Sequence, residues 1–185
     1  KTVIYNFRKN DLKNGGEGAP LTPIFHKVLV SQNKIDLPVT ILNIGGIANI
    51  TSIDKNKKIS SRDIGPGSCL VDSWVRNNSD KNFDDEGRIA RSGRINEIIL
   101  TQSLDNFYNN DISKKKSYDV KDFDPSFVRG LTLEDGAATL TEFSAKIFEN
   151  KNFHKNVYVC GGGRKNKFLL EKIEKVIESK INRRN

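Results

Sequence analysis

The sequence predicts an α/β domain in which a mixed sheet is flanked by helices. Two observations carry this prediction. Between residues 38 and 63, β-rich segments alternate with tight-turn residues, which is typical of consecutive antiparallel strands. Near the end of the chain, a short apolar strand is followed by three glycines and a helix with one apolar face. Antiparallel and strand–helix connections in one chain favour an α/β domain over a plain doubly wound sheet.

The first elements are predicted as a strand, a loop and a short helix. Residues 2–6 alternate weakly between apolar and polar, which favours a strand. Residues 9–23 are rich in glycine and proline and are predicted as a loop. A helix is expected to begin after Pro23 and to cover Phe25 to Val30.

Three strands are predicted next. Residues 38–44 and 47–53 are rich in β-branched side chains and flank Gly45-Gly46, so they are expected to form a hairpin. Residues 57–63 follow a second turn and form the third strand, which the loop Gly65-Pro66-Gly67 is expected to end.

Helices are predicted for most of the remaining chain. Ser68 and Thr132 are the expected N-caps of two of them. The predicted segments are a helix from Ser68 to about Asn77, a polar loop over 79–84, helices over Asp85–Arg91 and Ile95–Tyr108, an irregular stretch over 109–130, a long helix after Thr132, a buried strand over 156–160 and a final helix after Gly161-Gly162-Gly163.

Composition argues against a nucleic-acid or membrane partner. The 185 residues carry a formal net charge of +8, but the lysines are scattered and no basic stripe with interleaved aromatics appears. No run of about eighteen apolar residues exists, so no membrane span is predicted. The two cysteines, Cys69 and Cys160, are far apart, which argues against zinc or a disulfide framework and favours a cytoplasmic location. The start of the chain resembles a strand cut open, so a fragment is expected.

Two glycine segments could approach a phosphate or a planar ligand. At Asn43-Ile44-Gly45-Gly46, paired glycines at a hairpin tip expose backbone amides, although an ordinary turn is the alternative. At Gly161-Gly162-Gly163, three glycines between a strand and a helix remove every side chain from the turn. Tight strand–helix packing is the alternative there, because neither the dinucleotide nor the P-loop motif is present.

An acidic loop and an Arg/Asp pair are the other candidates. Asp63 ends a predicted strand beside Gly65-Pro66-Gly67, and such a carboxylate can accept a proton in phosphoryl transfer. The alternative is an aspartate that binds loop amides. Arg8 and Asp11 precede a glycine-rich loop and could bind an anionic or hydroxylated group, or form a surface ion pair.

The remaining polar side chains are predicted to have structural roles. Asp72 and Trp74 are expected to pack and cap a helix, and His26 to be structural rather than a general base. Asp135 and Glu142 are expected to be solvated on the long helix.

These segments together resemble one family, the anhydro-N-acetylmuramic acid kinases. The resemblance covers nearly the whole chain and rests on the order of the motifs. They are Asn6-Phe7-Arg8-x-x-Asp11, Gly15-Gly16-Glu17-Gly18-Ala19-Pro20-Leu21-x-Pro23-x-Phe25-His26, Asn43-Ile44-Gly45-Gly46-Ile47-Ala48-Asn49-Ile50-Thr51, Asp63-x-Gly65-Pro66-Gly67, Asp72-x-Trp74 and Cys160-Gly161-Gly162-Gly163-x-x-Asn166.

The resemblance implies an actin/hexokinase-like (ribonuclease H-like) ATPase lobe. That family uses ATP and Mg²⁺ to convert 1,6-anhydro-N-acetylmuramic acid and water into N-acetylmuramic acid 6-phosphate during cell-wall recycling. Another sugar or carboxylate kinase of the superfamily, or a catalytically incomplete binding module, is the alternative. Residues 1–35 would end the first lobe and connect the lobes, and residues 36–185 would form a second lobe that is incomplete at its C-terminus. A homodimer could form.

The resemblance also implies roles for individual residues. Asp63 is the candidate base, although Asp11 or an Asp of the missing lobe could hold that role. The residues implied to bind ATP are Asn43, Gly45, Gly46, Gly65, Gly67, Gly161, Gly162, Gly163 and Asn166. Those implied to bind the sugar are Arg8, Asp11, Gly18, Ala19 and Pro20.

Some positions depart from the family pattern. Asn6, Glu17, Ile64 and Ser68 stand where the family usually has Asp, Gln, Thr and Asn. The family's opening Gly-Thr-Ser-x-Asp-Gly phosphate loop is absent, so the chain alone is expected to be inactive.

Overall fold

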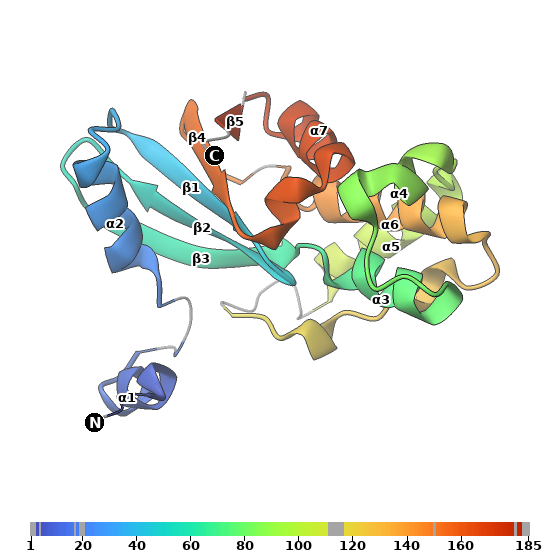
Figure 1. The fold of residues 1–185 in the computed structure, drawn as a ribbon, viewed down its shortest axis with the longest axis horizontal. Coiled ribbons are helices and arrows are strands. Elements are labelled where there is room, and N and C mark those ends of the chain that lie inside the picture. The colour runs from blue at the N-terminus through green and yellow to red at the C-terminus, as the bar shows by residue number, and fades with distance from the viewer. Residues whose placement is uncertain are drawn as a thin grey trace.

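A mixed five-stranded sheet forms the centre of the computed structural model (Figure 1). The structure describes residues 3, 5–16, 18, 21–110, 117–149, 151–179 and 181–182. The strands are β1 (Val39–Ile44), β2 (Ile47–Ile53), β3 (Ile59–Pro66), β4 (Asn156–Cys160) and β5 (Ile181–Asn182). Their order across the sheet is β3-β2-β1-β4-β5. The first three strands are antiparallel neighbours, whereas β4 runs parallel to both β1 and β5.

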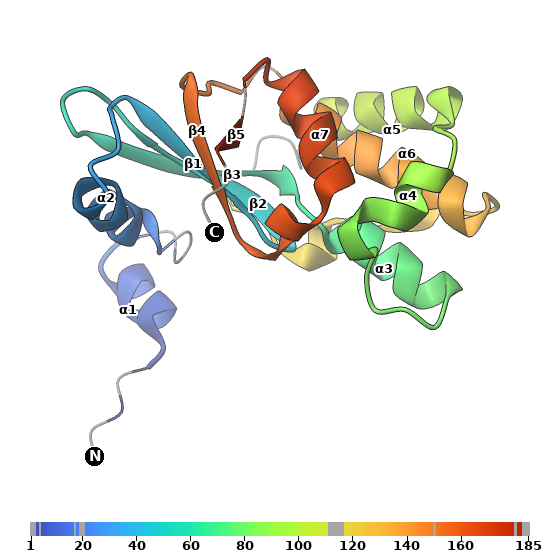
Figure 2. The ribbon, with the colours of Figure 1, turned by 45° about the horizontal axis from the view of Figure 1, so that its top comes forward.

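The two faces of the sheet bury different helices. Alternate residues of a strand point to opposite faces. Leu42 and Ile44 of β1 belong to the larger core, which is shared with the helices that follow β3. Val39 and Ile41 instead pack with Val30 of α2 (Pro23–Gln32). The helices therefore divide into two groups, with α2 apart from the later ones (Figures 1 and 2).

The larger core is centred on α6. This helix, α6 (Leu133–Lys146), is surrounded by α3 (Cys69–Asn78), α4 (Arg88–Ser92), α5 (Glu97–Asn109) and α7 (Lys167–Val176). Trp74 of α3 donates its indole N–H to the Leu133 carbonyl at 2.9 Å, and Gly136 lies against the same indole. This confirms the packing role predicted for Trp74. Thr132 caps α6 as predicted, accepting the Asp135 N–H at 3.1 Å.

Glu142 was predicted wrongly as a solvated residue. Its carboxylate lies 2.7 Å from the Lys172 ammonium group, and the two side chains are only 14% and 18% exposed. The pair joins α6 to α7. Helical periodicity placed Glu142 on a helix but could not show that another helix covers it.

The beginning of the chain also differs from the prediction. The described part of 2–6 contains no strand, and a helix, α1 (Phe7–Lys13), occupies part of the predicted loop. Asn6 caps this helix by accepting the Lys9 N–H at 3.2 Å. The capping interaction outweighs the weak alternation of the preceding residues, since an N-cap satisfies an otherwise unpaired helix amide.

Three further differences from the prediction occur in the middle and at the end of the chain. β3 continues through Gly65 and Pro66 instead of ending at Asp63. The predicted helix over 85–91 is a 3₁₀ turn, Asp85–Gly87, followed by α4. The short strand β5 was not predicted, because two residues carry no periodicity. No helix in the described part of the chain is both long and apolar enough to cross a membrane.

Candidate functional site

The candidate site is a cleft of about 570 Å³ where four segments meet. The hairpin tip contributes Gly45 and Gly46, and the glycine loop after β4 contributes Gly162 and Gly163. Asn166, which precedes α7, lies in the same cleft. Five residues predicted to bind a nucleotide therefore come together, although they lie more than a hundred positions apart in the sequence.

The hairpin tip is fixed by the loop before α3. The backbone N–H groups of Gly67 and Ser68 donate to the carbonyls of Gly46 and Gly45 at 2.8 and 2.9 Å. Gly67 must be small because a Cβ there would collide with the Gly45 carbonyl oxygen, and a Cβ on Gly65 would lie 2.8 Å from Ile147. Both glycines therefore have a packing role, and the structure does not place them in the wall of the cleft.

Ser68 does not cap α3 as predicted. Its hydroxyl donates to the Gly45 carbonyl at 3.3 Å, and no side-chain capping bond to the helix forms. The hairpin tip competes successfully for this hydroxyl because it packs directly against the start of α3. Ser68 thus lines the cleft and holds its glycine edge.

The three glycines after β4 are glycines for different reasons. Gly161 has φ +84°, and a Cβ there would lie 2.6 Å from Asn43 Oδ1. Gly163 packs against Ile44, whose carbonyl oxygen would lie 3.0 Å from an added Cβ. Gly162 has open space around it, with nothing within 4 Å of an added Cβ. Protein packing therefore explains two of the glycines but not Gly162.

Asn43 supports this turn from β1. Its Oδ1 lies 3.6 Å from the Cys160 thiol, which is in position to donate a weak hydrogen bond, and it borders Gly161. Asn43 is not among the residues that line the cleft. The structure thus gives Asn43 a positioning role, and direct contact with a nucleotide stays a prediction.

Asn166 has a structural role as well as its place in the cleft. Its Oδ1 accepts the Leu169 N–H at 2.9 Å and so caps α7. Gly87, at φ +75°, fits against this same side chain. Asn166 therefore connects the glycine loop with the 3₁₀ turn on the other side of the cleft.

That other wall, residues 82–86, was not predicted as part of a site. The Asp84 side chain is buried and accepts the N–H groups of Ile89 and Ala90 at 2.8 and 3.0 Å. Glu86 lies 2.6 Å from Lys167 and 2.8 Å from Arg88, and these bonds lower the pKa of its carboxyl group to about 2. The wall is thereby attached to the start of α7. The sequence pattern that could have pointed to this wall is a polar loop with successive acids between two predicted helices.

Asp72 was predicted to have only a packing or capping role, but its side chain also lines the cleft. It occupies the first turn of α3. Burial raises the pKa of its carboxyl group, opposed by the neighbouring Ser68 hydroxyl and by the charge of Arg76. An acid in this position is suited to a hydroxyl group or a cation rather than to a phosphate.

Asp63 lies on β3, outside the residues that line the cleft. Its Oδ2 accepts the Tyr118 N–H at 2.9 Å, and in the sheet it stands opposite Asn49. Burial, and next the charge of Asp63, raise the pKa of the Tyr118 hydroxyl. Asp63 does bind a loop amide, which was the alternative interpretation, and its role as a base stays a prediction.

Three of the predicted sugar-binding residues, Arg8, Asp11 and Gly18, lie on or shortly after α1, which stands apart from α3 and α7 in Figures 1 and 2. Asp11 Oδ2 accepts the Gly18 N–H at 2.8 Å, and Gly18, at φ +72°, lies against Arg8. Ala19 and Pro20 lie outside the described residues. The contacts of Arg8, Asp11 and Gly18 are thus within their own segment, and sugar binding by them stays a prediction.

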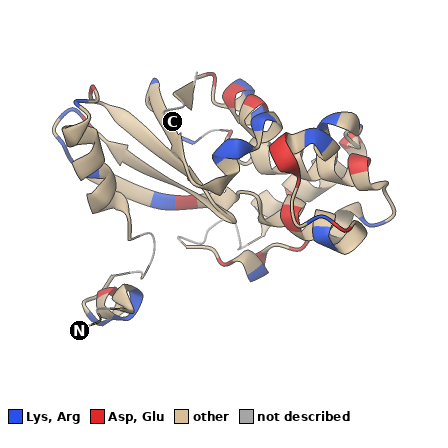
Figure 3. Ribbon diagram, viewed as in Figure 1, with Lys and Arg blue, Asp and Glu red and all other residues tan. Residues whose placement is uncertain are grey.

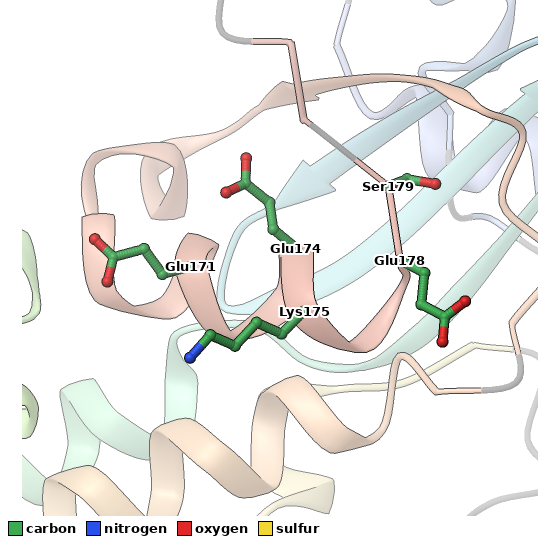
Figure 4. A pocket seen from close by; sticks show the side chains of 5 residues that line it. All are labelled: Glu171, Glu174, Lys175, Glu178 and Ser179. Atoms are coloured by element: carbon green, nitrogen blue, oxygen red, sulfur yellow. The ribbon is translucent and has the colours of Figure 1, made fainter.

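The second pocket and the surface charges are weaker candidates for a functional site than the cleft. A second pocket, of about 450 Å³, is lined by Glu171, Glu174, Lys175, Glu178 and Ser179 on and after α7 (Figure 4). Two of its acids have structural partners, Glu171 with Arg91 and Glu174 with the Ile181 amide. Lysines, arginines and acids are interspersed along the helices in Figure 3, with no stripe of one sign in that view. Among the described residues, no group of three His, Cys, Asp or Glu side chains could hold a metal ion.

His26 has the structural role predicted for it. It is buried on α2, with Nδ1 2.8 Å from Thr51 Oγ1 of β2. Burial lowers the pKa of the imidazole. It lies on the α2 side of the sheet and does not line the cleft.

Comparison with known proteins gives one consistent result. Residues 1–182 match the model of the family described as anhydro-N-acetylmuramic acid kinase. A relative of that name from Pelagibacter ubique is 50% identical over 98% of this chain and 51% of its own length. Another, from Caulobacter vibrioides, is 39% identical over 92% of this chain and 47% of its own length. The chain thus spans about half the length of these curated relatives.

Solved structures support the fold. Component A of (R)-2-hydroxyglutaryl-CoA dehydratase from Acidaminococcus fermentans aligns with a TM-score of 0.55 at 12% identity, over 88% of this chain and 61% of that one. The activator of 2-hydroxyisocaproyl-CoA dehydratase from Clostridium difficile, with bound ADPNP, aligns with a TM-score of 0.51 at 17% identity, over 82% and 55%. These two structures therefore support the predicted actin/hexokinase-like fold of the chain.

Proposed function

Because this chain belongs to the anhydro-N-acetylmuramic acid kinase family, we propose that its full-length protein is an ATP-dependent sugar kinase of bacterial cell-wall recycling. It converts 1,6-anhydro-N-acetylmuramic acid, water and ATP into N-acetylmuramic acid 6-phosphate and ADP. The reaction takes place in the cytoplasm, where ATP is available. The observation that carries the proposal is the cleft that gathers both glycine segments of the family's motif pattern.

The residues of the cleft suit a nucleotide. Gly162 leaves open space at the edge of the cleft, where a side chain would otherwise exclude a ligand. Gly45 and Gly46, at the hairpin tip beside this loop, offer backbone without side chains, as a phosphate-binding turn requires. When bound, ATP supplies the phosphoryl group that the sugar accepts. In this assignment, Gly162, Gly163 and Asn166 hold the adenosine side, and Gly45 and Gly46 the phosphate side.

Asp63 is the proposed base. Its carboxylate would take a proton from the water that attacks the anomeric carbon, while the bridge oxygen released from that carbon receives the phosphoryl group. The Tyr118 N–H occupies one position on Oδ2 and fixes the direction of the carboxylate. Such a fixed carboxylate suits a base that must meet a positioned water molecule.

Mg²⁺ would neutralise the phosphates of a bound ATP. The described residues offer no three-ligand group for a metal ion. The ion that ATP-dependent kinases need is commonly bound by substrate phosphates, water and one or two carboxylates. Of the four carboxylates that line the cleft, Asp84 is held by the amides of α4 and Glu86 by Lys167 and Arg88, so Asp72 and Asp85 are the ones that could contribute such a ligand.

Residues 1–35 are proposed to belong with a first lobe. Exposed large apolar side chains concentrate there, including Phe7, Ile24 and Phe25 at 64%, 74% and 59% exposure. A surface of this kind is commonly covered by another part of the protein. A first lobe packed on α1 and α2 would bury it, and residues 36–185 would form most of the second lobe.

The test is an assay of the full-length protein with 1,6-anhydro-N-acetylmuramic acid and with glucose. ADP should form with the anhydro-sugar and not with glucose, and the sugar 6-phosphate should be detected by mass spectrometry. The 185-residue chain alone should not turn over either sugar, because it spans only half of its relatives. Turnover of glucose alone would indicate another sugar kinase of the same fold.

The role of Asp63 is tested by Asp63→Asn in the full-length protein. Loss of a general base commonly costs about 10²- to 10⁴-fold in rate. The variant should therefore keep its ATP affinity while kcat falls by that factor. An unchanged kcat would refute Asp63 as the base without refuting the kinase.

A further inference from the structure

We propose that Phe83 is the platform on which the nucleotide base stacks, an assignment that rests on the ATP-binding function proposed above. Phe83 lies in the segment between α3 and the 3₁₀ turn and lines the cleft together with Gly162 and Gly163. Its side chain is 56% exposed. A base placed over the ring would remove this apolar surface from water.

The environment of Phe83 distinguishes it from other exposed apolar residues. In the described part of the chain, most of the large exposed apolar side chains lie before residue 30 or on the outer helices. Phe83 instead borders a cleft lined by glycines and by the polar side chains of Asp72, Arg76 and Lys165. An aromatic face among polar groups is the arrangement by which proteins bind a flat, polar-edged ring.

The backbone on both sides of Phe83 is fixed. The Asn82 carbonyl accepts a hydrogen bond from Arg76 Nη1 at 3.3 Å. The Asp84 carboxylate, only 4% exposed, binds the first amides of α4. The ring is therefore presented from an anchored segment, which lowers the entropy lost when a ligand binds.

The same segment is held at a set position relative to the glycine loop. Glu86 forms its ion pair with Lys167 at the start of α7, one residue after Asn166. Gly87 packs against the Asn166 side chain. These contacts connect the wall that carries Phe83 with the wall that carries Gly162.

Gly162 supplies the independent observation. No neighbouring atom lies within 4 Å of a Cβ built there, and its φ does not require glycine. A ligand that lies against the backbone at this position explains the missing side chain. A base between the Phe83 ring and the Gly162 backbone satisfies both observations.

Stacking on an aromatic ring also predicts the specificity of the site. Every base has a π-face, so stacking alone discriminates weakly between bases. Truncation of Phe83 should therefore weaken the binding of ATP and the binding of GTP by similar factors. Base-free tripolyphosphate, which cannot stack, should be unaffected.

The experiment measures nucleotide binding to the full-length protein by calorimetry, using the non-hydrolysable analogue ADPNP, its guanine counterpart and tripolyphosphate. Phe83→Ala should lower the affinity for both nucleotides roughly 5- to 150-fold, which is the range for the loss of one stacked base. Phe83→Trp, which keeps an aromatic face, should bind more tightly than Phe83→Ala. Ile98→Ala, at a 72% exposed residue of α5 away from the cleft, is the matched control and should change nothing.

The outcomes separate this proposal from the proposed function. Equal nucleotide affinity in the wild type and Phe83→Ala would overturn the stacking role and leave the kinase intact. An equal loss of tripolyphosphate binding would also overturn it, because the effect would then be structural. A wild-type protein that binds no nucleotide would refute the ATP-binding function itself.

Discussion

Alanine at Gly162 and at Gly163 should separate ligand binding from folding. The two positions are neighbours in one loop, but their surroundings differ. A Cβ at Gly163 would collide with the Ile44 side chain and lie 3.0 Å from the Ile44 carbonyl oxygen, whereas a Cβ at Gly162 meets nothing within 4 Å. The same methyl group is therefore placed in the core in one variant and in the cleft in the other.

The expected magnitudes follow from these distances. Overpacking a core costs about 1–3 kcal/mol, so Gly163→Ala should lower the free energy of unfolding by that amount. Gly162→Ala should raise it by about 0.4–1 kcal/mol, because alanine restricts the unfolded chain more than glycine does. With a nucleotide lying against Gly162, the added methyl group should overlap the ligand at a cost of about 1–3 kcal/mol. ATP binding should then weaken roughly 5- to 150-fold.

The assay combines thermal unfolding of the full-length variants with ADPNP calorimetry. Gly162→Ala should unfold at or above the wild-type temperature and bind the nucleotide weakly. Gly163→Ala should unfold several degrees lower. The reasoning fails if Gly162→Ala is as unstable as Gly163→Ala, or if it binds ADPNP as tightly as the wild type.

Three further predictions concern the core and its pH dependence. Gly136→Ala should destabilise the protein by up to about 2 kcal/mol in urea unfolding, because the overpacking cost of about 1–3 kcal/mol for a Cβ 2.5 Å from the Trp74 ring exceeds the roughly 1 kcal/mol gained from the helix propensity of alanine; a more stable variant would contradict this. Burial lowers the pKa of His26 from its ordinary 6.5, so the unfolded chain binds the proton first as the pH falls. The free energy of unfolding should therefore decrease below pH 6.5, and His26→Gln should flatten that decrease in a pH series. Glu142→Gln should cost about 1–3 kcal/mol because it leaves the Lys172 charge partly buried, and a cost near zero in chemical denaturation would indicate a solvated pair.

Local chemistry made much of the fold predictable from the sequence. The hairpin around Gly45-Gly46 and the strand over 156–160 occur within a residue of the predicted bounds, because turn residues and apolar runs act over short distances. The Thr132 cap was predictable for the same reason. The start of the chain was not, because alternation over a few residues is weak beside the Asn6 cap.

The candidate site was predictable in part. Gly45, Gly46, Gly162, Gly163 and Asn166 were identified before the structure placed them in one cleft. The wall over 82–86 was missed, because its residues acquire a role only when α4 and α7 meet. Glu142 illustrates the same limit, since its burial depends on a helix about thirty positions away.

The sequence by itself determined the family, the α/β class and the glycine segments, because these depend on residue order and on local backbone preferences. Only the tertiary structure showed which glycines are required by packing and which one is not. Gly65, Gly67, Gly161 and Gly163 are small because other parts of the chain pack against them, while Gly162 faces open space. It also brought Phe83 and Asp72 to the cleft and left Asp63 outside its lining. Contacts between residues far apart in the chain decide these points, and no local pattern contains them.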